Sequence, residues 1–280
     1  MIESIRKEKQ SVLLVDSGAV FGRQKETADL HLKAMELMGY DALNLGSPEL
    51  YFGRKFLAHT RSSVPFPYLA SNLLYGGGRL PWAREYIIKE VGGIRVAILG
   101  ILGPEALKDV PRRDQEKEFE VIPPKAALER LLPEIRKMAD LVVLLSQLDE
   151  EETRTLLQTA NGIDVMVIPQ SKQALVTITP PEKMVVVRTG TDGMTLGMVT
   201  VRLDNKRFPT VSERRTIPLD GSVPDNKEIL RLVETQKREQ ALQQEREKRE
   251  LIEGLKLTPQ EFMERHRRKE QSKQQKGEAQ

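Results

Sequence analysis

The chain has 280 residues, a formal net charge of +3, no cysteine and three histidines. This length allows one large domain or two ordinary ones, with a sizeable core. The lack of cysteine excludes disulfides, thiolate metal sites and cysteine nucleophiles. The small net charge gives weak support for nucleic-acid binding, and no apolar run approaches the roughly 20 residues that a membrane-spanning helix needs.

The first part of the chain alternates short apolar runs with helical patterns. Residues 11–15 predict a buried strand that ends at Asp16, residues 28–38 predict a helix closed by Gly39, and Ala42–Leu45 predict the next strand. The same patterns predict these further elements: strands at Tyr68–Ala70, Leu141–Leu145 and Ile163–Ile168, a hairpin of Tyr86–Glu90 with Ile94–Ile101, and helices at Pro124–Ala139 and Glu150–Ala160. This order is typical of a parallel α/β fold.

The pattern changes after residue 174. Val176–Thr179, Met184–Arg188 and Met198–Leu203 alternate or are β-branched, and no long helix separates them, which predicts antiparallel sheet over 174–217. Beyond Pro224 the chain becomes rich in Lys, Arg, Glu and Gln. We therefore expect an α/β domain over residues 1–222 and a charged helical tail over 223–280, in which two helices are separated by a break before the capping box Thr258–Glu261.

Several segments occur in an order that resembles the 5′-nucleotidase branch of the calcineurin-like metallophosphoesterases. The resemblance covers roughly residues 1–218 and implies a four-layer αββα sandwich of two mixed sheets, followed by the charged tail. It rests on the segments VLLVDSGAVFG (Val12–Gly22), AMELMGYDALNLGSPELYFG (Ala34–Gly53), FPYLASN (Phe66–Asn72), VAILGIL (Val96–Leu102), ADLVVLLSQ (Ala139–Gln147), IDVMVIPQSK (Ile163–Lys172) and GTDGMTL (Gly190–Leu196). Glu49 and Asn72 match family positions that are chiefly structural.

The resemblance implies a two-metal site at the strand ends, which would bind phosphate and activate water, but the positions that match its ligands have changed. The family's bridging Asp is Ala19 here, and its Asn-His pair is Ser47-Pro48. A later His is replaced by Gln147, and a Gly-His-x-His motif matches 169–172, where Gln170 and Lys172 stand. Alanine and proline offer no side-chain donor, and the Lys172 ammonium would repel a dication. No cofactor is therefore expected, with a divalent Mn, Zn or Mg ion as the alternative.

Four residues remain as ligand-binding candidates: Asp16, Gln147, Gln170 and Lys172. Gln170 and Lys172 would form a metal-free phosphate-binding corner, or else lie in a solvated loop. Asp16 lies at a strand end, where ligands gather in α/β sheets, although a structural turn role is the alternative. The three scattered histidines, His31, His59 and His266, do not easily build a site that needs several imidazoles.

Two functions follow from these observations. The first is a non-catalytic phosphoesterase-like protein that binds a ligand or a partner, and the alternative is a metal-dependent phosphoester or nucleotide hydrolase with an altered metal site. The tail is a candidate helix for a protein partner, although its evenly mixed charges also suit a solvated helix and argue against nucleic acid.

The start of the chain bears on where the protein acts. The family's first strand, with an Asp-x-His motif, has no counterpart, and Met1–Lys9 resembles the helix that follows that strand. As written, the chain is expected in the cytoplasm. If the true start lies upstream with a signal peptide, we expect a periplasmic or exported protein.

Overall fold

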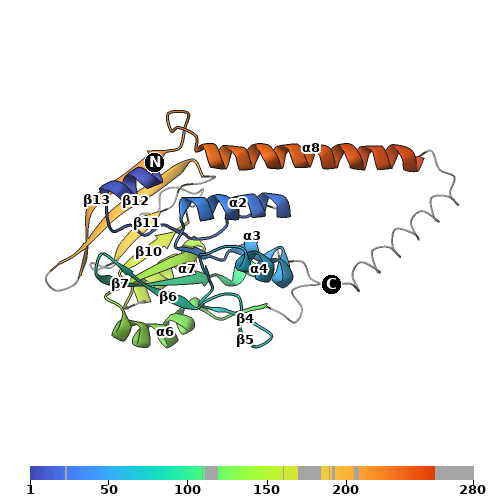
Figure 1. The fold of residues 1–280 in the computed structure, drawn as a ribbon. Helices are drawn as coiled ribbons and strands as arrows, with labels where there is room; N and C mark the ends of the chain where they lie inside the picture. Colours follow the sequence, from blue (N-terminus) through green and yellow to red (C-terminus); the bar gives the residue numbers. More distant parts are fainter. Residues whose placement is uncertain are drawn as a thin grey trace. The chain divides into compact units, whose positions relative to one another are not determined.

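The computed structural model describes residues 1–22, 24–108, 110, 119–159, 161–169, 184–188, 190, 193–204 and 208–255, without the side chains of residue 26 and residues 253–255. The chain divides into two compact units, Met1–Asp225 and Asn226–Gln280. Each unit is described by itself below. Figure 1 shows the elements of both.

The first unit begins with a small parallel sheet and the helices that cover it. Strands β1 (Val15–Asp16), β2 (Ala42–Asn44) and β3 (Tyr68–Leu69) pair in parallel in that order. The helices of this half are α1 (Ile2–Glu8), α2 (Lys25–Met38), α3 (Ser47–Leu50) and α4 (Gly53–Ser62). Gly39 ends α2 in the left-handed conformation, with φ 70°, which confirms the predicted C-cap.

A five-stranded sheet forms the centre of the first unit, in the order β11-β10-β9-β7-β6. Its strands are β6 (Tyr86–Val91), β7 (Ile94–Leu102), β9 (Leu141–Gln147), β10 (Val165–Ile168) and β11 (Val185–Arg188). The β6–β7 pair is the predicted antiparallel hairpin, and the other pairs are parallel. The expectation of antiparallel sheet from 174 onward is therefore wrong for β11. The connection from β10 is long enough for a crossover, so β11 can extend the parallel sheet.

Smaller antiparallel sheets and two further helices complete the unit. Strands β4 (Leu73–Tyr75), β5 (Gly78–Arg79) and β8 (Phe119–Val121) form one sheet, in the order β5-β4-β8. Strands β12 (Thr195–Leu203) and β13 (Pro209–Pro218) form the other, which confirms antiparallel pairing in this part of 174–217. The remaining elements are the 3-10 helix η1 (Pro104–Leu107) and the helices α6 (Pro124–Met138) and α7 (Glu150–Thr159). The predicted strand Val176–Thr179 lies outside the described residues.

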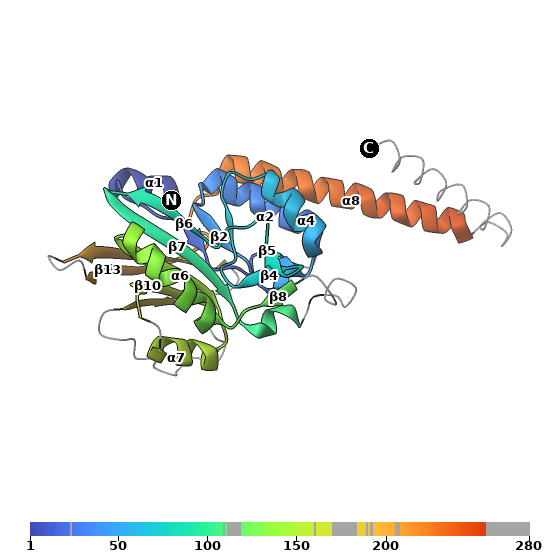
Figure 2. The ribbon, with the colours of Figure 1, turned by 90° about the horizontal axis from the view of Figure 1, so that it is seen from below.

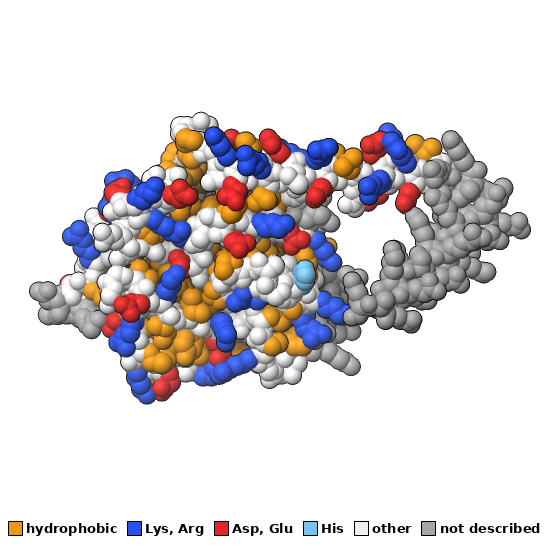
Figure 3. Space-filling view, viewed as in Figure 1, with side chains coloured by type: hydrophobic (Ala, Val, Ile, Leu, Met, Phe, Trp, Pro, Cys, Tyr) orange, Lys and Arg blue, Asp and Glu red, His pale blue; other side chains and the backbone are white. Residues whose placement is uncertain are grey.

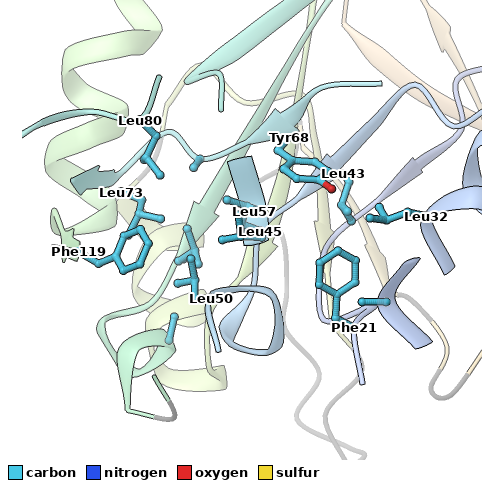
Figure 4. Packing of buried hydrophobic residues seen from close by; sticks show 14 of the residues in the cluster. Phe21, Leu32, Leu43, Leu45, Leu50, Leu57, Tyr68, Leu73, Leu80 and Phe119 are labelled. Carbon is cyan, nitrogen blue, oxygen red and sulfur yellow. The ribbon is translucent and has the colours of Figure 1, made fainter. Parts of the chain in front are cut away.

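Three buried clusters show how these layers pack. One fills the space between the small parallel sheet and the five-stranded sheet, with Leu69 and Ile98 among its residues. A second joins the small sheet to its helices and includes Leu32 and Tyr68, as Figure 4 shows. A third lies between the five-stranded sheet and α6 and α7, which cover its other face in Figures 1 and 2. The layers run helix, sheet, sheet, helix, which confirms the predicted four-layer α/β architecture.

The second unit contains one long helix, α8 (Lys227–Leu255), of 29 residues. The side chain of Asn226 caps its start, because Oδ1 accepts the backbone N–H groups of Glu228 and Ile229. Acidic and basic side chains alternate along it (Figure 3). Among the described residues, no helix combines the length and apolar character needed to cross a membrane. The predicted capping box at Thr258–Glu261 lies beyond the described part of the chain.

Candidate functional site

The loops that follow β1, β2 and β9 meet at the carboxyl ends of these strands, where the small parallel sheet lies beside the five-stranded sheet. An ideal Cβ placed on Gly18, after β1, would lie 2.8 Å from the carbonyl oxygen of Asn44 and 3.2 Å from Cγ of Gln147. One placed on Gly46, after β2, would lie 2.9 Å from the backbone nitrogen of Ala19. Only glycine fits such close approaches. The structure therefore brings together Ala19, the loop that contains Ser47 and Pro48, and Gln147.

Glu49 holds two of these loops together. Its carboxylate accepts four backbone N–H groups, from Ala19 at 3.0 Å, Val20 at 2.8 Å, Phe21 at 2.9 Å and Gly46 at 2.7 Å. The side chain is fully buried. Burial raises the pKa of Glu49 above its ordinary value, and the four N–H groups act in the opposite direction. Glu49 thus ties the loop after β1 to the loop after β2.

The backbone at Ala19 keeps a conformation that suits another residue type. Its φ is 65°, and it is the one non-glycine residue with positive φ among the described residues. Asn and Asp are enriched in this left-handed region, whereas alanine is uncommon there. In the resemblance, this is the position of the bridging aspartate. The loop therefore has an Asp-type backbone conformation without the carboxylate.

A second contact joins the loop after β1 to the centre of the molecule. The carbonyl oxygen of Ser17 accepts a hydrogen bond from Nε2 of Gln147 at 2.9 Å and another from Nδ2 of Asn44 at 3.0 Å. Asn44 is fully buried and also donates to the carbonyl of Ile101 at 3.2 Å. The sequence resemblance matches Gln147 with a family histidine, and here its amide nitrogen binds the protein's own backbone.

Asp16 lies at the end of β1, half-buried beside this network. Its Oδ1 accepts the N–H of Gly18 at 2.9 Å, which closes a two-residue turn. Burial raises the pKa of Asp16, and the Gly18 N–H opposes this shift. Burial together with the charge of Asp16 raises the pKa of Tyr40 to about 12. The turn role weighed for Asp16 is thus present in the structure.

The side chains at the matched positions do not fit a pair of divalent metals. Ala19 and Pro48 have no donor atom, Ser47 offers only a hydroxyl, and the Gln147 amide nitrogen is directed to Ser17. Such ions prefer carboxylate, amide-oxygen and imidazole ligands. Throughout the described ranges, no three His, Cys, Asp or Glu side chains gather as a metal-binding group. The candidates Gln170 and Lys172 lie outside the described residues.

Other residues considered from the sequence have structural roles. Asp149 and Glu152 form a reciprocal cap at the start of α7: the Glu152 N–H donates to Asp149 at 2.8 Å, and the Asp149 N–H donates to Glu152 at 3.1 Å. Asn72 is fully buried and exchanges hydrogen bonds with both backbone groups of Leu102. His31 lies on α2 and His59 on α4, and His266 lies outside the described residues.

Sequence reasoning missed Asn44 as part of this network. Its position carried a signal, because an amide side chain at the end of the apolar strand Ala42–Asn44 must find partners when buried. Its partners come from β7 and from the loop after β1. These partners come close to Asn44 only because the two sheets pack face to face.

Comparison with known proteins agrees with this architecture. No family model matches the chain. A 5′-nucleotidase from Bos taurus is 28% identical over 265 residues, which cover 81% of this chain and 44% of that protein. The structure of a 5′-nucleotidase precursor from Thermus thermophilus matches with a TM-score of 0.73 and 20% identity, over 86% of this chain and 52% of that one. The calcineurin-like phosphoesterase YfkN from Bacillus subtilis matches with a TM-score of 0.70 and 18% identity, over 85% and 86%.

These likenesses confirm the resemblance stated from the sequence. The chain has the fold of the calcineurin-like phosphoesterases and is similar to 5′-nucleotidases. It spans less than half the length of the Bos taurus relative. Activity, substrates and partners are therefore matters for the proposals that follow.

Proposed function

We propose that this protein is a non-catalytic relative of the 5′-nucleotidases that acts by binding a ligand or a partner. The observation that carries the proposal is the set of residues at the positions that the resemblance matches to the family's site: Ala19 stands for the bridging aspartate, Ser47-Pro48 for a ligand and a catalytic histidine, and Gln147 for a later histidine. Two-metal phosphoester hydrolysis needs several fixed oxygen and nitrogen donors at these strand ends. A similar fold alone supports no activity, because function resides in the site and not in the fold.

The hydrogen bonds of the site support the same proposal. Glu49 fixes the loops after β1 and β2, and Gln147 fixes the loop after β1 to β9. These contacts use only the chain's own donors and acceptors. The loops are thus ordered by the chain's own groups, and they present a surface at the strand ends, where α/β proteins commonly bind ligands.

The competing function is a phosphoester hydrolase with an altered metal site. Asp16 favours it, because its carboxylate lies at the end of β1 and Oδ1 has one hydrogen-bond partner at 2.9 Å. A carboxylate can take part in an oxygen-rich Mg²⁺ or Mn²⁺ site together with water and carbonyl groups. In this case turnover depends on Asp16 and on added metal.

Metal content and turnover separate the two functions. The full chain would be incubated with Mn²⁺, Zn²⁺ or Mg²⁺, desalted and measured by mass spectrometry for bound metal. Hydrolysis of AMP and of bis(p-nitrophenyl) phosphate would be measured with each ion. We expect no stoichiometric metal and no turnover above background. Stoichiometric metal together with turnover lost in Asp16→Asn, but kept in the exposed control Asp225→Asn, would overturn the proposal.

We also propose Gln170 and Lys172 as the polar part of a metal-free phosphate-binding corner. The Lys172 ammonium would balance the charge of a phosphate that the two metals balance in related enzymes. Isothermal titration calorimetry with inorganic phosphate and with AMP tests this. Binding that is weakened in Lys172→Gln and unchanged in Lys125→Gln, an exposed lysine on α6, is the expected result. If both variants bind phosphate and AMP equally well, the proposed role of Lys172 in phosphate binding is wrong.

A further inference from the structure

Most hydrophobic residues of α8 lie near its two ends, with Ala241 and Leu242 between them. Leu230 and Val233 lie in the first two turns, and Leu251 and Ile252 lie in the last two. Leu230, Leu251 and Ile252 are 41%, 65% and 44% exposed. Positions 230, 233, 237, 240, 244, 247 and 251 follow the alternating spacing of three and four residues that places side chains along one seam of a helix.

We propose that α8 pairs in antiparallel orientation with α8 of a second copy of this chain. Along this seam, residues whose numbers add to 484 face each other across a two-fold axis. Val233 then meets Leu251 of the partner subunit, and Gln240 meets Gln244 of the partner subunit. Each of these contacts occurs twice, because a two-fold interface uses the same surface of both copies. The apolar contacts of this register are thus the two Val233–Leu251 pairs, because Leu230 faces Gly254 of the partner subunit and Ile252 lies off the seam.

The charges of α8 fit the same register. Lys237 faces Glu247 of the partner subunit on the seam, and Glu234 lies beside Lys248 of the partner subunit at its edge. Both pairs are attractive and both recur by symmetry. In a parallel pair of the same helices, Lys237 would instead face Lys237 of the partner subunit, and Glu247 would face Glu247 of the partner subunit. Like charges that face each other select against an arrangement.

The seam also explains why the pairing should be modest in strength. Its middle layers contain Lys237, Gln240, Gln244 and Glu247, which form polar contacts, and the apolar layers lie only near the ends. Surface charge pairs contribute little each and are weakened by salt. We therefore expect a reversible dimer in the micromolar range that dissociates as ionic strength rises. The charge pairs set its orientation and its dependence on salt, and the two Val233–Leu251 contacts add apolar burial near its ends.

Sedimentation equilibrium of the full chain tests the pairing. Lys237→Glu places glutamate against Glu247 of the partner subunit in two symmetric contacts and should raise the dimer Kd about tenfold. Glu247→Lys should do the same. The double variant Lys237→Glu with Glu247→Lys restores opposite charges and should recover the original Kd to within about twofold. Arg249→Glu, which lies off the seam, is the matched charge reversal that should leave the Kd nearly unchanged.

Cross-linking tests the orientation without interference, because the chain has no cysteine of its own. Copies that carry Gln240→Cys and copies that carry Gln244→Cys would be mixed and oxidised. The antiparallel register predicts disulfides between the two kinds of copy and few within either kind alone. Monomers at every concentration, a double variant that stays as weak as the singles, or cross-links between like copies would each overturn the proposal. These results do not depend on whether the protein binds metal or hydrolyses phosphoesters.

Discussion

Replacement of Glu49 by glutamine tests whether its carboxylate organises the loops of the site. Each carboxylate oxygen accepts two backbone N–H groups: Oε1 accepts those of Val20 and Phe21, and Oε2 accepts those of Ala19 and Gly46. Glutamine has the same shape but only one acceptor oxygen. Its amide NH₂ would face two N–H donors, which leaves both of them without an acceptor in the interior.

The magnitude follows from those two donors. A buried N–H that loses its acceptor costs about 1–3 kcal/mol, so two cost about 2–6 kcal/mol. The glutamine also removes a buried charge, and this relief offsets part of the loss. We expect Glu49→Gln to lower the free energy of unfolding by about 2–4 kcal/mol. For a unit of this size, that corresponds to a fall in Tm of about 5–15 °C.

Urea denaturation followed by tryptophan fluorescence is the appropriate assay. Trp82 is the one tryptophan of the chain and packs against the same buried cluster as Phe21, so it reports on the first unit alone. Glu134→Gln, at an exposed position on α6, is the matched control and should change stability by less than about 0.5 kcal/mol. A Glu49→Gln protein within that same margin of the wild type would refute the role given to the carboxylate.

Three further predictions concern the loop after β1. Gly18→Ala should destabilise the protein by about 2 kcal/mol or more, since the Cβ of the new alanine would meet the carbonyl oxygen of Asn44. The control Gly77→Ala also lies at positive φ but has open space around it, and it should cost only about 1 kcal/mol in the same urea titration. Ala19→Asn should keep or raise Tm, because asparagine tolerates positive φ better; a clear loss would contradict the strain argument. Because burial raises the pKa of Asp16, its contribution to stability is fully present below the ordinary value of 3.8 and is lost as pH rises through the folded pKa. Asp16→Asn should therefore gain stability relative to the wild type as pH rises from 4 to 7, and a constant difference would contradict this.

The sequence predicts the layers of the first unit because its periodicity is local. The run before Asp16, the pattern before Gly39 and the hairpin about Gly92-Gly93 each contain their own start and end signals. The direction of β11 was predicted wrongly, because an alternating or β-branched run does not show which neighbour it pairs with. That choice depends on β10, whose edge is open to one more parallel strand.

The contacts of the site could not be predicted from the sequence, for a different reason. Glu49 accepts N–H groups from residues about 30 positions away, and Gln147 donates to Ser17, 130 positions away. A motif shows that a donor has been replaced, but it does not show what the replacement binds. Gln147 was identified as a candidate ligand, and only the assembled strand ends show its amide nitrogen turned to a backbone carbonyl.

The retained conformation at the strand ends bears on how the two proposed functions can be told apart. In a site that is organised by metal ions, removal of the ions frees the loops that bear the ligands. Here the loop after β1 is held by Glu49, Asn44 and Gln147, so its order should not depend on added metal. Hydrogen exchange of Ala19 and Val20 should therefore be equally slow with EDTA and with Mn²⁺. Protection that appears only with Mn²⁺ would favour an altered metal site, even in the absence of a known substrate.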